Sequence, residues 1–158
     1  MTKVAALIAA AGRGHRFGGE LPKQYYNWRG DTILRHTLKT FIEDTRIDRV
    51  ITVICEEDLE LYNKAIEGLE LLPPINGGAT RQESVLIGLE ALEDYGPDIV
   101  LIHDAARPFV TDAMVSEVID RLKNYAGVVP GVPVADTLKL VQNGLVETTV
   151  DRTDLWRV

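Results

Sequence analysis

Short apolar strands alternate with longer helical segments along most of this chain, and this alternation restricts the fold more than any other feature. Three runs are short, continuous and apolar, as buried strands are: Val4–Ala10, Arg49–Cys55 and Asp98–His103. Helical patterns separate these runs. Strands joined through helices form right-handed βαβ units and a mainly parallel sheet. We therefore expect an α/β fold with helices on both faces of the sheet.

Capping residues and acidic first turns mark the first two expected helices. Asp31 is placed to cap a helix over Thr32–Glu43, whose apolar residues recur on one side. A second helix is expected over Glu56–Leu69, because acidic residues stand in its first turn. Both helices lie between expected strands, as a parallel sheet requires.

The next helix signal is a capping box, in which Thr80 and Glu83 satisfy each other's backbone amides. We expect a helix from there to about Asp94. A further helix is expected over Thr111–Tyr125, with a fourth strand at Gly127–Val134. The side chains expected to face inward from that last helix are Met114, Val115, Val118, Ile119 and Leu122.

The pattern changes near the end of the chain, in Ala135–Arg152. Apolar residues there alternate loosely around Asn143-Gly144, and Asn-Gly between such alternations is the strongest short signal for a β-hairpin. A late antiparallel hairpin is either an extension at the edge of the sheet or an arm that reaches a partner. The pattern alone leaves both interpretations open.

Charge and composition exclude several classes of partner. The formal net charge of −7 predicts no general attraction to nucleic acid or to an anionic membrane. The apolar run Val4–Ala11 is too short to cross a bilayer. A signal peptide is disfavoured, because a glycine-rich basic loop follows that run. The single cysteine, Cys55, excludes an internal disulfide and fits a reducing compartment, so we expect a cytoplasmic protein.

The first strand leads into the stretch AAAGRGHRFGGELPKQ, which begins at Ala9. It fails the dinucleotide-binding pattern at Phe17 and the Walker pattern at Glu20, where the phosphate-binding lysine would stand. Its glycines still allow backbone N–H groups to approach a phosphate closely. Arg16 and Lys23 add positive charge, and the extended Leu21-Pro22 step restricts the direction of the lysine. The stretch therefore predicts a phosphate site of another kind.

Five motifs, in their order along the chain, identify a family. The segments AAAGRGHRFGGELPKQY, GGATRQESV, HDAARPF, PVADT and TVDR resemble those of 2-C-methyl-D-erythritol 4-phosphate cytidylyltransferases. The resemblance implies a Rossmann-like nucleotidyltransferase fold, a homodimer and a requirement for Mg²⁺. It also implies a reaction of CTP with methylerythritol phosphate that gives CDP-methylerythritol and pyrophosphate. The hairpin would then be an arm that enters the partner subunit.

The resemblance implies roles for particular residues. Arg16 and Lys23 would stabilise the transition state, and Asp104 would bind magnesium. Arg81 would either shape the cytidine loop or remain solvated at the start of its helix. The residues implied to line the nucleotide are Ala10, Ala11, Gly12, Gly14, Gly78, Ser84, Asp104 and Ala105. Those implied to hold the methylerythritol phosphate are Arg107, Thr137 and Arg152.

The family pattern continues beyond the last residue of this sequence. Residues 1–158 would thus form a nucleotidyltransferase domain that is incomplete at its C-terminal side, with residues 135–152 as a β-arm. Some members of the family are fused to a cyclodiphosphate synthase. Two alternatives stay open at this point, a ribitol-5-phosphate cytidylyltransferase and a non-catalytic nucleotide-binding subunit.

Overall fold

The computed structural model describes residues 2–12 and 21–158. The chain divides into two compact units, Met1–Val115 and Ser116–Val158. The first unit contains the main sheet and the helices packed on it, and the second contains two small antiparallel strand pairs.

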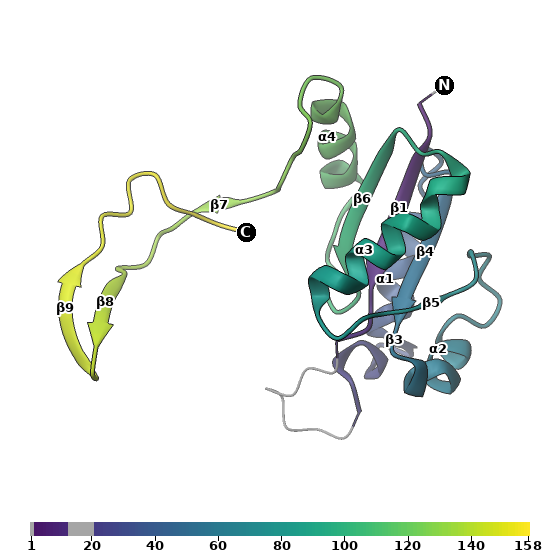
Figure 1. Cartoon of the computed structure of the whole chain (residues 1–158), viewed down its shortest axis with the longest axis horizontal. Coiled ribbons are helices and arrows are strands. Elements are labelled where there is room, and N and C mark those ends of the chain that lie inside the picture. Colours follow the sequence, from purple (N-terminus) through teal and green to yellow (C-terminus); the bar gives the residue numbers. More distant parts are fainter. Residues whose placement is uncertain (1, 13–20) are drawn as a thin grey trace. The chain divides into compact units, whose positions relative to one another are not determined.

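The first unit is built on a four-stranded parallel sheet (Figure 1). Its strand order is β5 (Ile75–Asn76), β4 (Arg49–Ile54), β1 (Val4–Ala9) and β6 (Ile99–Asp104). Each neighbouring pair runs parallel. The three strands expected from the sequence are confirmed, with bounds that differ by one residue. A parallel sheet follows from their continuous apolar runs, which suit strands buried on both faces.

Helices cover both faces of this sheet, as the sequence predicted (Figure 1). Side chains alternate along β1, so Ala5 and Leu7 join an apolar cluster with α3 (Arg81–Leu92). Ala6 and Ile8 point to the opposite face and are fully buried there. Figure 1 shows α3 in front of the sheet and α1 (Ile33–Ile42) behind it.

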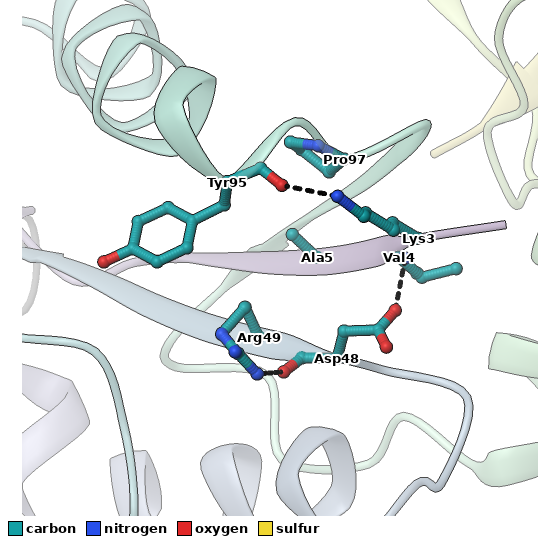
Figure 2. Close-up of a pocket in the computed structure, with 7 residues that line it drawn as sticks. All are labelled: Lys3, Val4, Ala5, Asp48, Arg49, Tyr95 and Pro97. Carbon is teal, nitrogen blue, oxygen red and sulfur yellow. Dashed lines mark hydrogen bonds between the residues drawn. The ribbon is translucent and has the colours of Figure 1, made fainter. Parts of the chain in front are cut away.

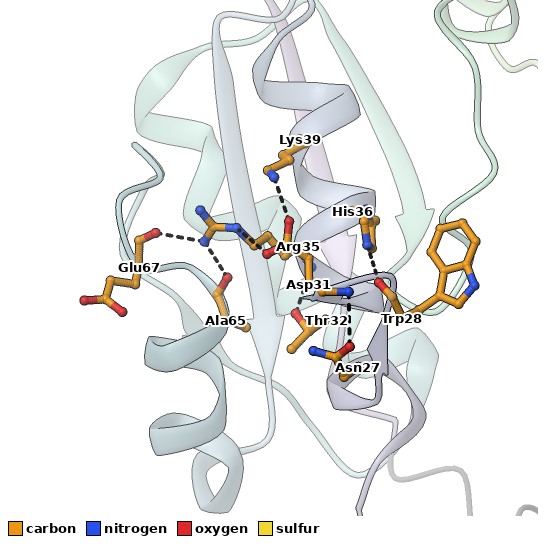
Figure 3. Close-up of polar contacts among 10 residues, drawn as sticks. Asn27, Trp28, Asp31, Thr32, Arg35, His36, Lys39, Ala65 and Glu67 are labelled. Atoms are coloured by element: carbon orange, nitrogen blue, oxygen red, sulfur yellow. Dashed lines mark hydrogen bonds and ion pairs between the residues drawn. The ribbon is translucent and has the colours of Figure 1, made fainter.

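The start of α1 corrects one expectation, because Thr32 and not Asp31 is the N-cap. The Thr32 hydroxyl accepts a hydrogen bond from the backbone N–H of Arg35 at 3.1 Å. Asp31 instead pairs with Lys39 at 2.8 Å and with Arg35 at 3.4 Å (Figure 3). Both residues form β3 (Asp31–Thr32), which pairs with β2 (Asn27–Trp28). The short strand pair therefore delays the helix by one residue.

The other helices of the first unit follow the sequence with one change. The expected helix over Glu56–Leu69 consists of a 3-10 turn, η3 (Glu56–Asp58), and a shorter α2 (Leu59–Ala65). The helix start at Thr80 is confirmed, because the Thr80 hydroxyl accepts from the Glu83 N–H at 3.1 Å. The second half of the capping box differs, since the Glu83 carboxylate accepts from the N–H of Ala79, one residue before the cap, at 2.9 Å. α3 ends in η4 (Glu93–Tyr95), near the expected boundary.

α4 (Asp112–Leu122) begins in the first unit and continues into the second. Val115 and Ile119 are buried as expected. Met114 is 43% exposed, so the prediction that it faces inward was wrong. The strand expected over Gly127–Val134 is also wrong, since only β7 (Val132–Pro133) forms there. Pro130 lies before β7, and a proline cannot donate to a strand ladder.

The hairpin predicted around Asn143-Gly144 is confirmed. β8 (Lys139–Gln142) and β9 (Leu145–Thr149) pair antiparallel, and Asn143 and Gly144 have φ angles of 50° and 80° between them. These are the positive φ values of a tight hairpin turn. A second antiparallel pair joins β7 to β10 (Trp156–Arg157). The strands of the hairpin expose all of their residues, apolar ones included.

None of the helices in the part of the chain that the structure describes is long and apolar enough to cross a membrane.

Candidate functional site

Loops that follow the parallel strands meet at the carboxyl edge of the sheet, where α/β sheets bind their ligands. Backbone hydrogen bonds continue the ladder past the strand ends and fix these loops side by side. Ala10 N donates to Val53 O at 2.7 Å, and Gly77 N donates to Ile54 O at 2.8 Å. Ala105 N donates to Ala9 O at 3.0 Å. The loops after β1, β5 and β6 are therefore adjacent.

The loop between β5 and α3 is folded around the hydroxyl of Ser84, which is 3% exposed. This oxygen accepts from Gly78 N at 3.1 Å and donates to Thr80 O at 2.9 Å. The loop also lies close to the loop after β1, because a Cβ at Gly77 would lie 2.7 Å from the Cβ of Ala11. Gly77 was not among the site residues expected from the sequence, although it is the first residue of the GGATRQESV motif.

Asp104 has a cationic partner on each carboxylate oxygen. Its Oδ1 accepts from Arg81 at 2.8 and 3.1 Å, and its Oδ2 pairs with Arg107 at 3.0 Å. The arginine side chains are 63% and 65% exposed, so each ion pair contributes only about 0–1 kcal/mol. Arg81 is thus largely exposed, and it also connects the start of α3 to the end of β6 through this ion pair.

His103 precedes Asp104 but is directed toward other groups. Its Nε2 lies 2.9 Å from the carbonyl oxygen of Arg107, and its ring centroid is 5.1 Å from that of Phe41. Burial lowers the pKa of the imidazole below its ordinary value, so His103 is neutral at pH 7. These contacts give it a structural position between β6 and the loop that follows.

Lys23 opens a short 3-10 helix, η2 (Lys23–Tyr25), and is half-buried. Pro22 before it is extended, with φ −61° and ψ 141°, as the sequence predicted. The next residue, Gln24, is 3% exposed and donates from its side chain to Ala10 O at 2.7 Å. Lys23 therefore lies beside the loop that follows β1. Gln24 is a site residue that the sequence reasoning did not identify.

Not every expected site residue can be placed at this edge. Arg16 and Gly14 lie outside the described residues. Thr137 and Arg152 belong to the second unit, where both are exposed and the Arg152 guanidinium donates to the carbonyl oxygen of Ala135. The structure brings the remaining candidates together at the carboxyl edge: Ala10, Ala11, Gly12, Lys23, Gly78, Ser84, Asp104, Ala105 and Arg107.

The residues at this edge fit a magnesium ion that is shared with phosphate. Among the described residues, no group of three or more His, Cys, Asp or Glu side chains could hold a metal ion without other ligands. Magnesium usually binds one or two carboxylates together with phosphate oxygens and water. A single carboxylate, Asp104, at the end of β6 is therefore a chemically suitable but partial ligand set.

A small pocket lies at the opposite, amino end of the sheet, where β1 and β4 begin (Figure 2). Its polar groups bond mainly to one another. Lys3 Nζ donates to Tyr95 O at 3.5 Å, and Val4 N donates to the Asp48 carboxylate at 2.8 Å. These contacts attach the strand starts to the preceding loops. We do not assign the functional site to this pocket, because parallel α/β sheets bind ligands at the other edge.

The fold and this edge define the class of protein. A glycine-containing loop after β1, a half-buried lysine and an aspartate at the end of β6 surround the position that nucleotides occupy in such sheets. The chain is thus an α/β protein of the nucleotidyltransferase type. It belongs to the 2-C-methyl-D-erythritol 4-phosphate cytidylyltransferase family, whose model matches residues 4–158.

Relatives and solved structures agree with this assignment. The chain is 52% identical to a bifunctional enzyme IspD/IspF of Paramagnetospirillum magneticum and 52% identical to one of Rhodospirillum rubrum. It covers 41% of the length of each relative, with 99% of this chain matched. A crystal structure of a 4-diphosphocytidyl-2C-methyl-D-erythritol synthase matches with a TM-score of 0.81 and 35% identity. The match covers 99% of this chain and 72% of that one.

A second solved structure supports the same fold. The 2-C-methyl-D-erythritol 4-phosphate cytidylyltransferase (IspD) of Francisella tularensis matches with a TM-score of 0.78 and 30% identity. That alignment covers 99% of this chain and 69% of the other. The Rossmann-like nucleotidyltransferase fold expected from the sequence is therefore confirmed.

Proposed function

We propose that the protein containing this chain transfers a cytidylyl group from CTP to 2-C-methyl-D-erythritol 4-phosphate. The products are CDP-methylerythritol and pyrophosphate, in isoprenoid biosynthesis. Family membership supports this proposal. The structural observation that carries it is the meeting of the first loop, the Ser84 loop and Asp104 at one edge of the sheet.

The proposed reaction needs charge stabilisation more than proton transfer. The nucleophile is a phosphate monoester with a second pKa of about 6, so it is already anionic at pH 7. It attacks the α-phosphorus of CTP, and pyrophosphate leaves with the electron pair of the broken bond. An anion must therefore approach a polyanion, and cations with fixed donors must lower the barrier. His103 is not required as a base, because its Nε2 is already engaged by the Arg107 carbonyl.

The chain's own residues would divide this work. Lys23, with Arg16, would neutralise the phosphoryl oxygens of the transition state. Backbone groups at Ala10, Ala11 and Gly12 would line the nucleotide, together with Gly14, Ala105 and the Gly78–Ser84 loop. Asp104 would hold Mg²⁺, which supplies positive charge to the triphosphate when it is bound. Arg107, Thr137 and Arg152 would position the methylerythritol phosphate.

We also propose that the hairpin β8–β9 is a dimerisation arm. Four of its apolar side chains are 45–76% exposed: Leu140, Val141, Leu145 and Val146. Clustered exposed apolar residues mark interaction surfaces. A homodimer through this arm would cover them. The reduced thiol Cys55 fits the cytoplasm, which we propose as the compartment.

The test uses the full-length protein with CTP and Mg²⁺. Pyrophosphate release is measured with methylerythritol phosphate and, separately, with ribitol 5-phosphate. Turnover with the first substrate alone is the expected result. Preference for ribitol 5-phosphate would contradict the proposed substrate, and CTP binding without turnover would indicate a non-catalytic subunit.

Two variants test the proposed catalytic cations. Lys23→Ala and Arg16→Ala should each lower kcat by about 10²–10³, the effect of losing one strong electrostatic contact in the transition state. Lys64→Ala, at an exposed position in α2, is the matched control and should leave kcat unchanged. A near-normal kcat in either test variant would remove that residue from the catalytic role.

A further inference from the structure

Gln24 is a buried polar residue to which the proposed function gives no role. Its carboxamide Nε2 donates to the carbonyl oxygen of Ala10 at 2.7 Å and to that of Gly12 at 3.3 Å. Only 3% of the residue is exposed, and Lys23 directly precedes it in η2. One side chain thereby connects the loop after β1 to the element that carries the proposed catalytic lysine.

We propose that Gln24 is a positioning residue, whose two hydrogen bonds hold the backbone from Ala10 to Gly12 and orient the Ala11 amide for nucleotide binding. The inference deepens the proposed function and rests on it, because a bound nucleotide gives the orientation its purpose. Gln24 acts through the backbone of the loop. It does not touch the reacting atoms.

Peptide geometry explains how a buried amide can orient a phosphate loop. A trans peptide is planar, so its C=O and the following N–H point in opposite directions. Holding the Ala10 carbonyl toward Gln24 therefore turns the N–H of Ala11 away from Gln24. The same contact fixes the loop next to Lys23, so the distance between the Ala11 N–H and the Lys23 ammonium group stays constant.

The side chain at this position needs two N–H donors and no charge. A primary amide has both donors on one nitrogen, which matches the two carbonyl acceptors. A carboxylate would face the same carbonyl oxygens without a proton to donate. Burial of this position also disfavours a charged side chain, because a buried charge loses its hydration. Glutamine therefore suits this position, and a change to glutamate tests the need for the amide most directly.

The experiment uses the full-length protein and two variants of similar side-chain length. Gln24→Met removes both donors without adding charge, and Gln24→Glu keeps the shape of the side chain but removes the amide. Asn63→Asp makes the same change from amide to carboxylate at an exposed position in α2 and is the matched control. Three quantities are measured: amide hydrogen exchange at Ala11 and Gly12, the dissociation constant for CTP, and the midpoint of unfolding.

In Gln24→Met, the amides of Ala11 and Gly12 should exchange faster, and the CTP dissociation constant should rise about tenfold or more. In Gln24→Glu, the loss of CTP affinity relative to wild type should be larger at pH 8 than at pH 6. A protonated carboxyl, favoured by burial at the lower pH, can donate one of the two hydrogen bonds. The Asn63→Asp control should follow wild type at both pH values.

Two results would overturn the inference. One is unchanged amide exchange at Ala11 and Gly12 in folded Gln24→Met. The other is a lowered unfolding midpoint with wild-type CTP affinity and pH profile, which would leave Gln24 a purely structural role. Failure of the wild-type protein to bind CTP would instead refute the proposed function. The exchange measurement would still decide whether Gln24 orients the loop.

Discussion

Gly88→Ala tests the close packing of α3 on the sheet, which sets the position of the loop and helix start at the site. Gly88 is buried in the middle of α3. A Cβ added there would lie 2.6 Å from Leu7 Cδ1 and 2.7 Å from Val53 Cγ2. Non-bonded carbon atoms prefer about 3.5–4.0 Å, so the methyl group would overlap two side chains by about 1 Å. Both side chains are fully buried and cannot move into solvent.

Two opposing effects determine the size of the change. Replacing glycine by alanine inside a helix stabilises the helix by about 1 kcal/mol. Overpacking a buried site costs about 1–3 kcal/mol, and two overlaps with fully buried neighbours place Gly88→Ala toward the upper end. The net expectation is a loss of about 1–2 kcal/mol in the free energy of unfolding. For a chain of this size, that lowers Tm by about 2–8 °C.

Urea unfolding of the chain, followed by far-ultraviolet circular dichroism, measures this loss. Glu90→Ala, at an exposed position on the same helix, is the control and should change the free energy of unfolding by less than about 0.5 kcal/mol. Leu7→Val removes the closest clashing atom, so Gly88→Ala should be less harmful in that background. If the single variant Gly88→Ala were more stable than wild type, the predicted overlap would be refuted, because the gain in helix propensity would then exceed the cost of overpacking.

Three further predictions follow from the structure. Arg81→Gln removes the ion pair to one oxygen of Asp104, so the affinity for Mn²⁺ should rise about two- to fivefold, which corresponds to the free energy of an exposed ion pair. Electron paramagnetic resonance measures this affinity, and the control Arg121→Gln should leave it unchanged. Because burial lowers the pKa of His103, the unfolded state binds its proton more readily, and the free energy of unfolding should fall as pH drops below about 6.5. His103→Gln should weaken that dependence. Leu145→Asp in the hairpin should shift the full-length protein from dimer to monomer in analytical ultracentrifugation.

Local signals in the sequence predicted much of the fold because their physical causes are local. Val4–Ala9 is apolar at every position, and such a run suits a central strand of a parallel sheet. Thr80 and Glu83 lie within one helical turn, so their capping contact depends little on the rest of the chain. The turn at Asn143-Gly144 is likewise set by the backbone preferences of two residues.

Expectations failed where a distant partner decided the outcome. Asp31 has a good side chain for a cap, but Lys39, two turns along α1, pairs with it, and Thr32 makes the capping hydrogen bond. Met114 fits the apolar periodicity of α4, yet only some of that face is buried. Gln24 carried no signal of its own, because its two acceptors stand 12 and 14 residues earlier in the chain.

Under the proposed function, the charge arrangement at the carboxyl edge explains how an acidic chain would hold an anionic ligand. The chain has a net charge of −7, so it repels polyanions in general. Arg81 and Arg107 nevertheless converge on Asp104, and two guanidinium groups against one carboxylate leave a local excess of positive charge. The N-terminus of α3 adds partial positive charge beside Arg81. Under the proposed function, a cation that binds Asp104 would also release these arginines toward the phosphate oxygens, so metal and nucleotide should bind cooperatively.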